Sequence, residues 1–392
     1  MRRTEHRQGV RVMSFLNVLS RWEAAEIGQC DAAELLGVSE RTFRRWRDQY
    51  AEEGEAGLVD GRLGKASGKR VSQDKRDEVA DLYRKRYQGF TAKHFHERLT
   101  SHHAFKGGYT WTKQLLHSTG LLQKAKTRGA HRRKRPRRPL PGMMLHQDGS
   151  RHQWLAEGPA LDLIVTMDDA TSGILSAFLC AEEGTDSTFR GLREVFDKHG
   201  LPLSFYTDRG SHYFHTPEAG GKVDRKNPTQ VGRALDRLGV EHIAAYSPQA
   251  RGRSERAFHT LQDRLPKELA LAGIAAMEAA NVFIRDVYVP AHNKRFAKPP
   301  EQEGSAFVKL AAGVDLGETL CVQEDRKVGN DNCVIFHKLK LQIPESPLRA
   351  HFVKAGVRVR KYQDGTHAIF HGQRCIGRYD SAGAIVEEKK AA

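Results

Sequence analysis

The sequence has few cysteines and no long apolar run, and both absences exclude classes of protein. An odd number of scattered thiols without CxxC spacing is typical of a reduced cytoplasmic protein and not of a disulfide framework. No segment approaches the ~18–20 uninterrupted apolar residues that a membrane helix needs. Residues 1–9 are basic and contain no apolar signal-peptide core. The five cysteines are Cys30, Cys180, Cys321, Cys333 and Cys375.

Acidic residues are also scarce relative to basic ones. The 392 residues include 64 Lys and Arg but only 48 Asp and Glu, which gives a net charge of +16. A protein this basic usually meets a polyanion, because each phosphate contact releases condensed counterions. A ribosome-associated or merely soluble basic protein remains an alternative. The length exceeds one ordinary core and predicts two to four domains. We expect a cytoplasmic location, associated with the nucleoid when DNA is bound.

Residues 1–65 predict a helix-turn-helix DNA-binding domain, although any small three-helix domain could carry a similar pattern. Ala33 allows two helices to cross closely, Gly37 makes the turn and Ser39 caps the next helix. The second helix then exposes basic and polar side chains, as a helix that reads the major groove would. The residues predicted to contact DNA are Arg41, Thr42, Arg44, Arg45 and Arg47.

A second helical domain is predicted over residues 70–123, after a charged, Gly-rich linker at 54–69. Its expected helices cover 73–87, 91–102 and 110–118, with Thr110 as the cap of the last. This domain resembles a second helix-turn-helix, and a structural spacer is the alternative.

Residues 124–141 form a basic linker that contains no acidic residue. Such a block repels itself and is extended in isolation. Its position between helical units and a third domain favours an arm that follows DNA phosphates, although a solvated tether is possible. The residues assigned to DNA in this arm are Arg132, Arg133, Lys134 and Arg135.

The remaining chain predicts two more domains. Strands are expected at 143–148, 161–167, 174–180, 203–207 and 240–246, with helices at 185–199, 228–238, 252–271 and 277–293. This order predicts a mixed α/β domain over residues 142–305. Short strands at 319–323, 333–336, 357–362, 367–370 and 373–379 predict a small β-barrel over residues 314–384.

Three acidic residues stand out by their positions. Asp148 and Asp208 are each expected at the end of a strand, and each is followed closely by glycine, which leaves the carboxylate open at the sheet edge. Glu255 lies near the start of a long helix, at the margin of its apolar stripe. Each acid alone is usually a turn former or a solvated residue. Together they provide what two hard divalent metal ions need for in-line phosphodiester displacement.

The segments around these acids resemble the DDE catalytic core of bacterial insertion-sequence transposases, which are related to retroviral integrases. The resemblance rests on Asp148, on residues 206–211 (Tyr-Thr-Asp-Arg-Gly-Ser) and on residues 247–256 with Glu255. It implies an RNase H-like core, two Mg²⁺ or Mn²⁺ ions held by the three acids, 3′-end cleavage and strand transfer to target DNA. It also implies binding to terminal inverted repeats as a homo-oligomer.

Two departures from the family pattern concern spacing and a basic residue. The 46 residues between Asp208 and Glu255 exceed the spacing in many relatives, and this wider spacing is similar to the ISNCY group. Relatives often carry Lys or Arg at the position of Gln262, so Arg264 is the candidate for the DNA contact there, with Lys267 as another. Arg251 shares the helix face of Glu255 and is also predicted to bind DNA.

Other interpretations stay open. The pair Asp168 and Asp169 could be mistaken for metal ligands, but the resemblance implies a structural role. A transposon-derived DNA-binding regulator without catalysis, or an RNase H-like nuclease that cuts but does not join, are the alternative functions.

Overall fold

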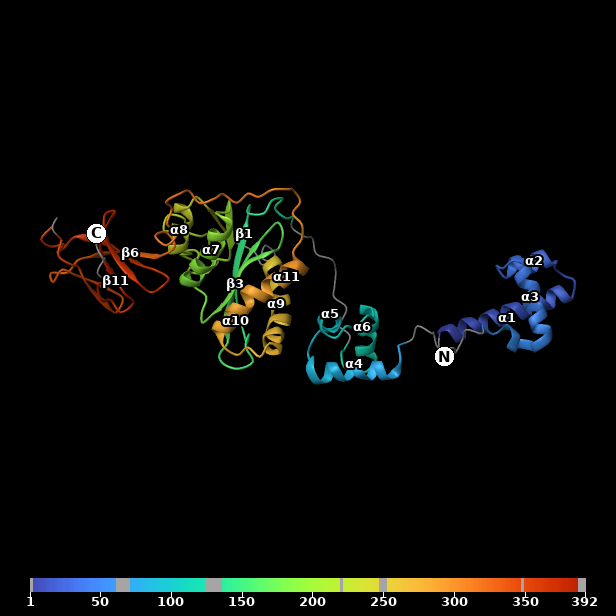
Figure 1. Ribbon diagram of the computed structural model, residues 1–392. Helices are drawn as coiled ribbons and strands as arrows, with labels where there is room; N and C mark the ends of the chain where they lie inside the picture. The colour runs from blue at the N-terminus through green and yellow to red at the C-terminus, as the bar shows by residue number, and fades with distance from the viewer. Residues whose placement is uncertain are drawn as a thin grey trace. The chain divides into compact units, whose positions relative to one another are not determined.

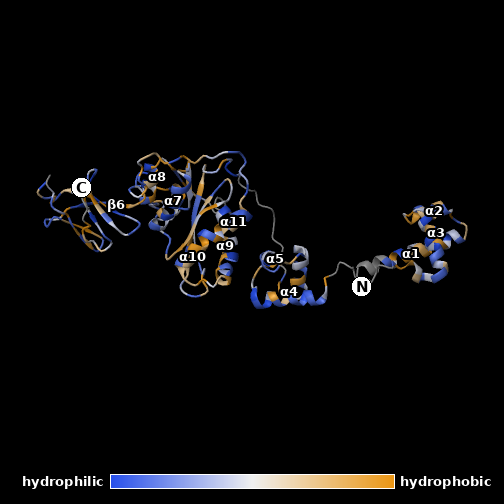
Figure 2. Cartoon of the chain, viewed as in Figure 1, coloured by the Kyte–Doolittle hydropathy of each residue, from blue (hydrophilic) through white to orange (hydrophobic). Residues whose placement is uncertain are grey.

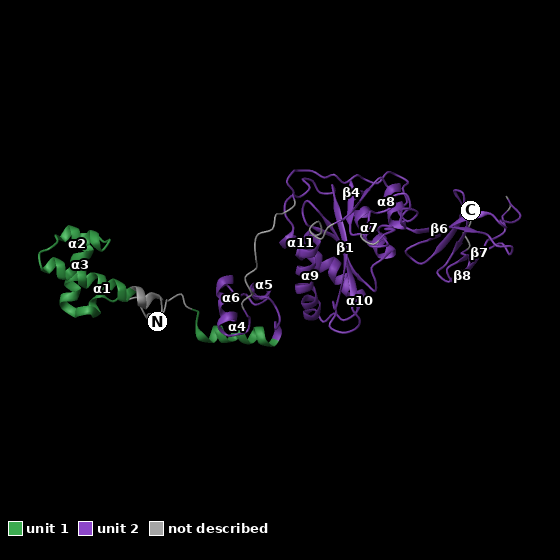
Figure 3. Ribbon diagram, turned by 180° about the vertical axis from the view of Figure 1, so that it is seen from behind, with its two compact units in different colours: residues 1–85 green, residues 86–392 purple. Residues whose placement is uncertain are grey.

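The computed structural model describes residues 3–60, 71–123, 136–218, 221–246, 252–346 and 349–386. The chain divides into two compact units, residues 1–85 and 86–392 (Figure 3). Among the described residues, no helix is both long enough and apolar enough to span a membrane. The domain boundaries inferred from the sequence remain predictions.

The first unit contains the helix-turn-helix. Helix α1 (Arg3–Glu23) is followed by α2 (Gln29–Leu35), α3 (Glu40–Glu53), the 3₁₀ turn η1 (Gly54–Leu58) and α4 (Gln73–Arg86). Gly37 has a φ of +63°, and the Ser39 side chain accepts a hydrogen bond from the Thr42 amide, so the predicted turn and cap are confirmed. Phe15, Ala32 and Phe43 are buried in the core of this unit.

The second unit begins with two helices, α5 (Ala92–His102) and α6 (Tyr109–Ser118). Thr91 caps α5 by accepting a hydrogen bond from the His94 amide. The predicted cap at Thr110 is wrong: α6 already includes this residue, and Gly108 precedes the helix at the cap position.

A five-stranded mixed sheet forms the centre of the second unit (Figure 1). Its strands are β1 (Leu145–His152), β2 (Leu161–Asp168), β3 (Ile174–Cys180), β4 (Ser204–Thr207) and β5 (Glu241–Ala244), in the order β3-β2-β1-β4-β5. β1, β2 and β3 are antiparallel neighbours, whereas β4 is parallel to both β1 and β5. The core is thus RNase H-like, as the sequence predicted.

Helices cover both faces of this sheet. Helices α7 (Thr185–His199) and α8 (Gln230–Arg237) share one apolar core with Leu145 and Phe205. On the other face, α9 (Gly252–Leu271) and α10 (Met277–Phe283) pack with Leu163 and Val165. Figure 2 shows apolar residues along the central strands and on α10. The predicted single helix at 277–293 is interrupted by a π-helical turn, η3 (Ile284–Tyr288), before α11 (Val289–Phe296).

The C-terminal strands pair as two sheets around one core. β6 (Val322–Lys327), β9 (Gly356–Lys361), β10 (His367–His371) and β11 (Arg374–Tyr379) form an antiparallel sheet, and β7 (Cys333–Phe336) pairs with β8 (Leu339–Gln342). In the part of the chain that the structure describes, these two sheets are separate, so the predicted barrel is not one continuous sheet. The expected strand at 319–323 was placed too early, and β8 was not predicted.

Candidate active site

Asp148 lies within β1 and not at its end. The strand continues to His152 because β2 pairs with it over its whole length, from Leu145 opposite Asp168 to His152 opposite Leu161. The prediction that Gly149 ends the strand was therefore wrong. On its other side, β1 pairs with β4 only at Leu145 and His146, so Asp148 lies just beyond the last β4 partner.

The two aspartates occupy equivalent positions with respect to two neighbouring parallel strands: Asp148 lies in β1, and Asp208 directly follows β4. His146 pairs with Tyr206, and each aspartate follows one of these residues by two positions. Neighbouring strands lie about 5 Å apart. Asp148 is opposite Val165, which packs in the core beneath α9, so its side chain is on the face that α9 covers. The sheet therefore brings Asp148 and Asp208 to one edge on the α9 side.

Asp208 is held by the turn that follows β4. Its Oδ1 accepts a hydrogen bond from the Gly210 amide at 2.8 Å, and its backbone carbonyl accepts one from the Thr207 hydroxyl at 3.0 Å. Asp208 is half-buried, whereas Asp148 is 8% exposed. Asp208 thus lies just beyond the end of its strand, as predicted, and the Gly210 amide helps to hold its carboxylate.

Glu255 lies in the first turn of α9, where its side chain is exposed. The predicted stripe of this helix is buried: Phe258, Leu261, Leu265 and Leu269 all have 8% exposure or less. Gln262, two turns after Glu255, donates a hydrogen bond to the Ser150 hydroxyl at 2.9 Å. α9 therefore contacts β1 two residues beyond Asp148.

The described residues contain no preformed group of three His, Cys, Asp or Glu side chains spaced to hold a metal ion. Two of the predicted ligands are brought together by adjacent strands, and the third is on the helix that covers them. The set provides only carboxylate oxygens, the ligands that Mg²⁺ prefers.

Glu183 is an additional acid beside this edge that the sequence prediction missed. A side chain at Gly149 would collide with the Glu183 carboxylate, so this carboxylate lies against β1 on the sheet face opposite to the one from which the Asp148 side chain projects. Tyr213 places its hydroxyl 3.1 Å from Gln147 Oε1 and 3.5 Å from Glu183 Oε1. Burial raises the pKa of Tyr213, and the charges of Glu183, Asp148 and Asp208 contribute. A signal was present, because Gly184 follows Glu183 just after a strand.

The two acids at the end of β2 make structural contacts. Asp168 accepts hydrogen bonds from the Gly142 amide at 2.9 Å and from the Thr171 amide and hydroxyl at 2.8 Å. Asp169 accepts from the Arg138 amide and from His146, and it forms an ion pair with Arg253. These contacts agree with the structural role predicted for both residues.

The predicted DNA contacts of the helix-turn-helix differ in their surroundings. Arg41, Arg44 and Arg45 are exposed on α3. Thr42 is part of the helix cap, and the Arg47 guanidinium pairs with Asp48 at 2.8 Å and lies over the Trp22 ring. The other predicted contacts, Arg132, Arg133, Lys134, Arg135 and Arg251, lie outside the described residues.

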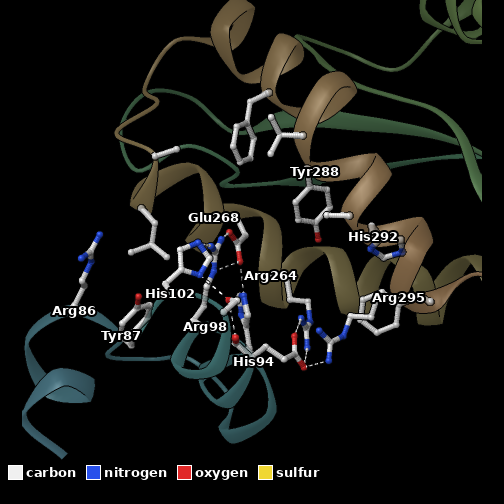
Figure 4. A pocket seen from close by; sticks show the side chains of 18 residues that line it. Arg86, Tyr87, His94, Arg98, His102, Arg264, Glu268, Tyr288, His292 and Arg295 are labelled. Atoms are coloured by element: carbon white, nitrogen blue, oxygen red, sulfur yellow. Dashed lines mark hydrogen bonds and ion pairs between the residues drawn. The ribbon is translucent and has the colours of Figure 1, made fainter. Parts of the chain in front are cut away.

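Arg264, the predicted replacement for the basic residue missing at Gln262, is engaged in an ion pair. Its guanidinium contacts the Glu97 carboxylate at 2.7 Å, and Arg295 pairs with the same carboxylate (Figure 4). Beside this cluster, Glu268 of α9 pairs with Arg98 and accepts from His94 at 2.5 Å. Helix α5 is thus docked on α9 and α11 by ion pairs between partly buried side chains.

A cavity of about 550 Å³ lies at this docking face, between α5 and the helices α9 and α11 (Figure 4). Tyr288 and His292 line it, and burial lowers the pKa of His292 to about 4, with a smaller contribution from Arg264. His292 is therefore neutral at pH 7.

The helix-turn-helix and the RNase H-like sheet with paired acids at one edge define a DNA-binding protein with an integrase-type core. Residues 22–77 match the family model of the winged helix-turn-helix. The sequence is 31% identical over 355 residues to the putative transposase y4bF of Sinorhizobium fredii, covering 89% of this chain and 76% of the relative. The chain belongs to this family of transposases.

Further similarities are more local. The transposase for insertion sequence IS1202 of Streptococcus pneumoniae is 34% identical over 163 residues, covering 41% of this chain and 34% of the relative. A simian T-cell lymphotropic virus intasome structure aligns with a TM-score of 0.34 and 15% identity, over 76% of this chain and 97% of that chain. The HTLV-2 integrase catalytic core in complex with magnesium aligns with a TM-score of 0.28 and 15% identity, over 36% of this chain and 82% of that chain.

Proposed function

We propose that this chain is a DDE transposase that binds the terminal inverted repeats of an insertion sequence and catalyses 3′-end cleavage and strand transfer. The observation that supports this most is the equivalent position of Asp148 in β1 and Asp208 directly after the parallel neighbour β4, on the side of the sheet covered by the helix that carries Glu255. A DNA-binding helix-turn-helix in the same chain supports DNA as the substrate.

Asp148, Asp208 and Glu255 would hold two Mg²⁺ or Mn²⁺ ions. Three carboxylates fit these ions because hard cations bind oxygen and keep several water ligands for exchange with substrate phosphate. When bound, a pair of such ions activates the attacking oxygen and stabilises the leaving oxygen of an in-line displacement. Glu255 has to approach the sheet edge from α9, since its side chain is exposed in the first turn of this helix.

The reaction has two displacements at phosphorus. In the first, a water oxygen bonds to the scissile phosphorus, the bond to the 3′ oxygen breaks, and the element end is left with a free 3′ hydroxyl. In the second, this hydroxyl attacks a phosphodiester of the target DNA, and the displaced target strand leaves with its own 3′ hydroxyl. The number of phosphodiester bonds is conserved in the second step, so no energy source is required.

DNA recognition is assigned to two regions. Arg41, Arg44 and Arg45 project from α3 and are available to bases and phosphates of the terminal repeat. The basic segment at 124–135 would follow the phosphate backbone toward the core. A homo-oligomer is proposed because two element ends have to be joined to one target.

The test compares Asp208→Asn with Asp197→Asn, an exposed acid on α7, on DNA that carries the element ends. We expect Asp208→Asn to abolish cleavage and strand transfer while terminal-repeat binding stays within about twofold, and Asp197→Asn to behave as the wild type. A wild-type protein that neither nicks nor joins these ends with Mg²⁺ or Mn²⁺ would refute the catalytic proposal in favour of a DNA-binding regulator. Nicking without joining would favour a nuclease.

A further inference from the structure

One buried carboxylate, Asp169, contacts residues of β1 and α9, two of the elements that carry predicted catalytic acids. It is 1% exposed and follows β2 directly. His146 of β1 lies 2.7 Å from Asp169 Oδ1, and Arg253 of α9 forms an ion pair with the same oxygen. These contacts outweigh the cost of burial, so they hold the pKa of Asp169 well below its usual range.

Each partner in this cluster is two residues before a predicted catalytic acid. His146 precedes Asp148 by two positions on β1, and Arg253 precedes Glu255 by two positions in the first turn of α9. In β1, residues two positions apart project from the same face. In α9, Arg253 and Glu255 are connected through the helix backbone, because residues two positions apart lie on different sides of a helix.

The third acid is connected through an aromatic contact. The rings of His146 and Tyr206 pack edge to face at 5.1 Å between centroids, and these two residues are partners in the β1–β4 register. Tyr206 precedes Asp208 by two positions. A displacement of His146 would therefore shift residues of both β1 and β4.

The same cluster fixes the end of the basic segment. The Arg138 amide donates to Asp169 Oδ2 at 2.7 Å, and Arg253 donates to the Pro136 carbonyl at 2.7 Å. Arg137 donates to the Asp169 carbonyl at 3.0 Å and to the Ser172 hydroxyl at 2.7 Å. Residues 136–138 thus form hydrogen bonds with the β2–β3 turn and with Arg253 of α9.

We propose that Asp169 and Arg253 form a positioning pair that couples the position of residues 136–138 to the placement of Glu255 over the β1–β4 edge. This inference rests on the proposed function, since it concerns the geometry of the metal ligands. Neither residue touches metal or DNA in this role. A displacement of Pro136–Arg138 would be transmitted to the first turn of α9 by Arg253, which donates to the Pro136 carbonyl and pairs with Asp169.

The experiment uses full-length protein with Arg253→Gln and Asp169→Asn. Arg256→Gln is the matched control, because Arg256 lies in the same turn, is exposed and donates only to the Gly252 carbonyl among the contacts described. Cleavage of element ends is measured against Mg²⁺ concentration. Both positioning variants should need at least fivefold more Mg²⁺ for half-maximal cleavage and lose on the order of 10²-fold in maximal rate. Binding to the terminal repeat in metal-free buffer should stay within twofold.

A second readout does not depend on activity. Trypsin cleavage of the Arg137–Arg138 bond, followed by mass spectrometry, should accelerate at least tenfold in both variants, because the contacts that hold this segment are lost. The control should show wild-type kinetics in both assays. Arg253→Lys keeps the charge toward Asp169 but cannot bridge to Pro136 as the guanidinium does, so it should show an intermediate Mg²⁺ requirement even if Asp169→Asn does not fold.

The outcomes separate the two proposals. Wild-type protein that fails to cleave refutes the proposed function, whereas the trypsin assay still reports on the coupling. If the wild type cleaves and Arg253→Gln has the same Mg²⁺ requirement and maximal rate, the positioning role is refuted, whatever happens to the trypsin site. An unchanged trypsin site would refute the coupling to the basic segment.

Discussion

Substitution of Arg264 distinguishes a docking residue from a DNA contact. The sequence assigned Arg264 to terminal DNA, but its guanidinium pairs with Glu97 of α5 at 2.7 Å, and the two side chains are 12% and 15% exposed. Breaking a buried ion pair by removing one partner costs about 3–5 kcal/mol. Glu97 keeps Arg295 as a second partner, and both groups retain some exposure, so we expect about 2–3 kcal/mol for Arg264→Gln.

The loss of this ion pair should lower the free energy needed for α5 to open away from α9. Hydrogen exchange of α5 amides measures that opening directly. A cost of 2–3 kcal/mol corresponds to exchange that is roughly 30- to 150-fold faster, at 1.36 kcal/mol for each factor of ten. Glu97→Gln should have a similar effect. In a double-mutant cycle the two substitutions should show a coupling energy of about 1–3 kcal/mol, because each removes the same contact.

Terminal-repeat binding at several salt concentrations provides the opposing test. If Arg264 is a docking residue, the slope of affinity against salt should be unchanged in Arg264→Gln, since no phosphate contact is lost. A slope reduced by about one unit, together with wild-type exchange of α5, would refute the docking role and restore the DNA contact predicted from the sequence.

Three further predictions follow from local geometry. Gly191→Ala should lower the free energy of unfolding in urea by about 1–3 kcal/mol, although alanine favours helices. The reason is that the added Cβ would lie 2.4 Å from Gln147 Nε2 and disturb its buried hydrogen bond to Thr166, and a stabilised variant would contradict this. Burial lowers the pKa of His242 to about 3 and that of His292 to about 4. The contribution of these two neutral rings to the free energy of unfolding is therefore complete above pH 6.5 and is lost as the pH falls. Lowering the pH from 7 to 5 should reduce the free energy of unfolding by about 2 kcal/mol for each ring, and His292→Phe should lose less stability than the wild type. Equal losses of stability in variant and wild type would refute the role of His292. Arg44→Ala and Arg45→Ala should weaken terminal-repeat binding by about 1–3 kcal/mol where bases are contacted, whereas Arg47→Ala should have less effect because Arg47 pairs with Asp48; unchanged affinity would move recognition to the second helical region.

Strong periodicity made the central elements predictable from the sequence. The predicted bounds of β3, α7 and α9 coincide with the structure, since each has an uninterrupted apolar pattern. The strand end at Asp148 was misjudged because glycine usually marks a turn. At Gly149 the missing side chain instead makes room for the Glu183 carboxylate, and β2 continues the pairing.

Contacts between distant segments were not predictable. Glu97 and Arg264 are 167 residues apart, and neither belongs to a motif that would indicate a partner. The resemblance implied only a structural role for Asp169, and its connection to Arg253 depends on how α9 packs across the sheet. Sequence patterns identify faces and ends of elements, but pairing of buried charges depends on the tertiary arrangement.

The long spacing between Asp208 and Glu255 is accommodated by residues that anchor the segment after Asp208. Tyr213 is buried in the core, its carbonyl accepts from the Thr229 hydroxyl at 2.9 Å, and Phe214 stacks on His242 of β5 at 4.0 Å between ring centroids. His215 and Asp224 are joined by an antiparallel bridge that closes the base of the insertion. Because these contacts fix the chain on both sides, the turn that presents Asp208 and the start of α8 keep their places whatever the length between them. The additional residues therefore extend a loop and leave the order of the strands that carry the acids unchanged.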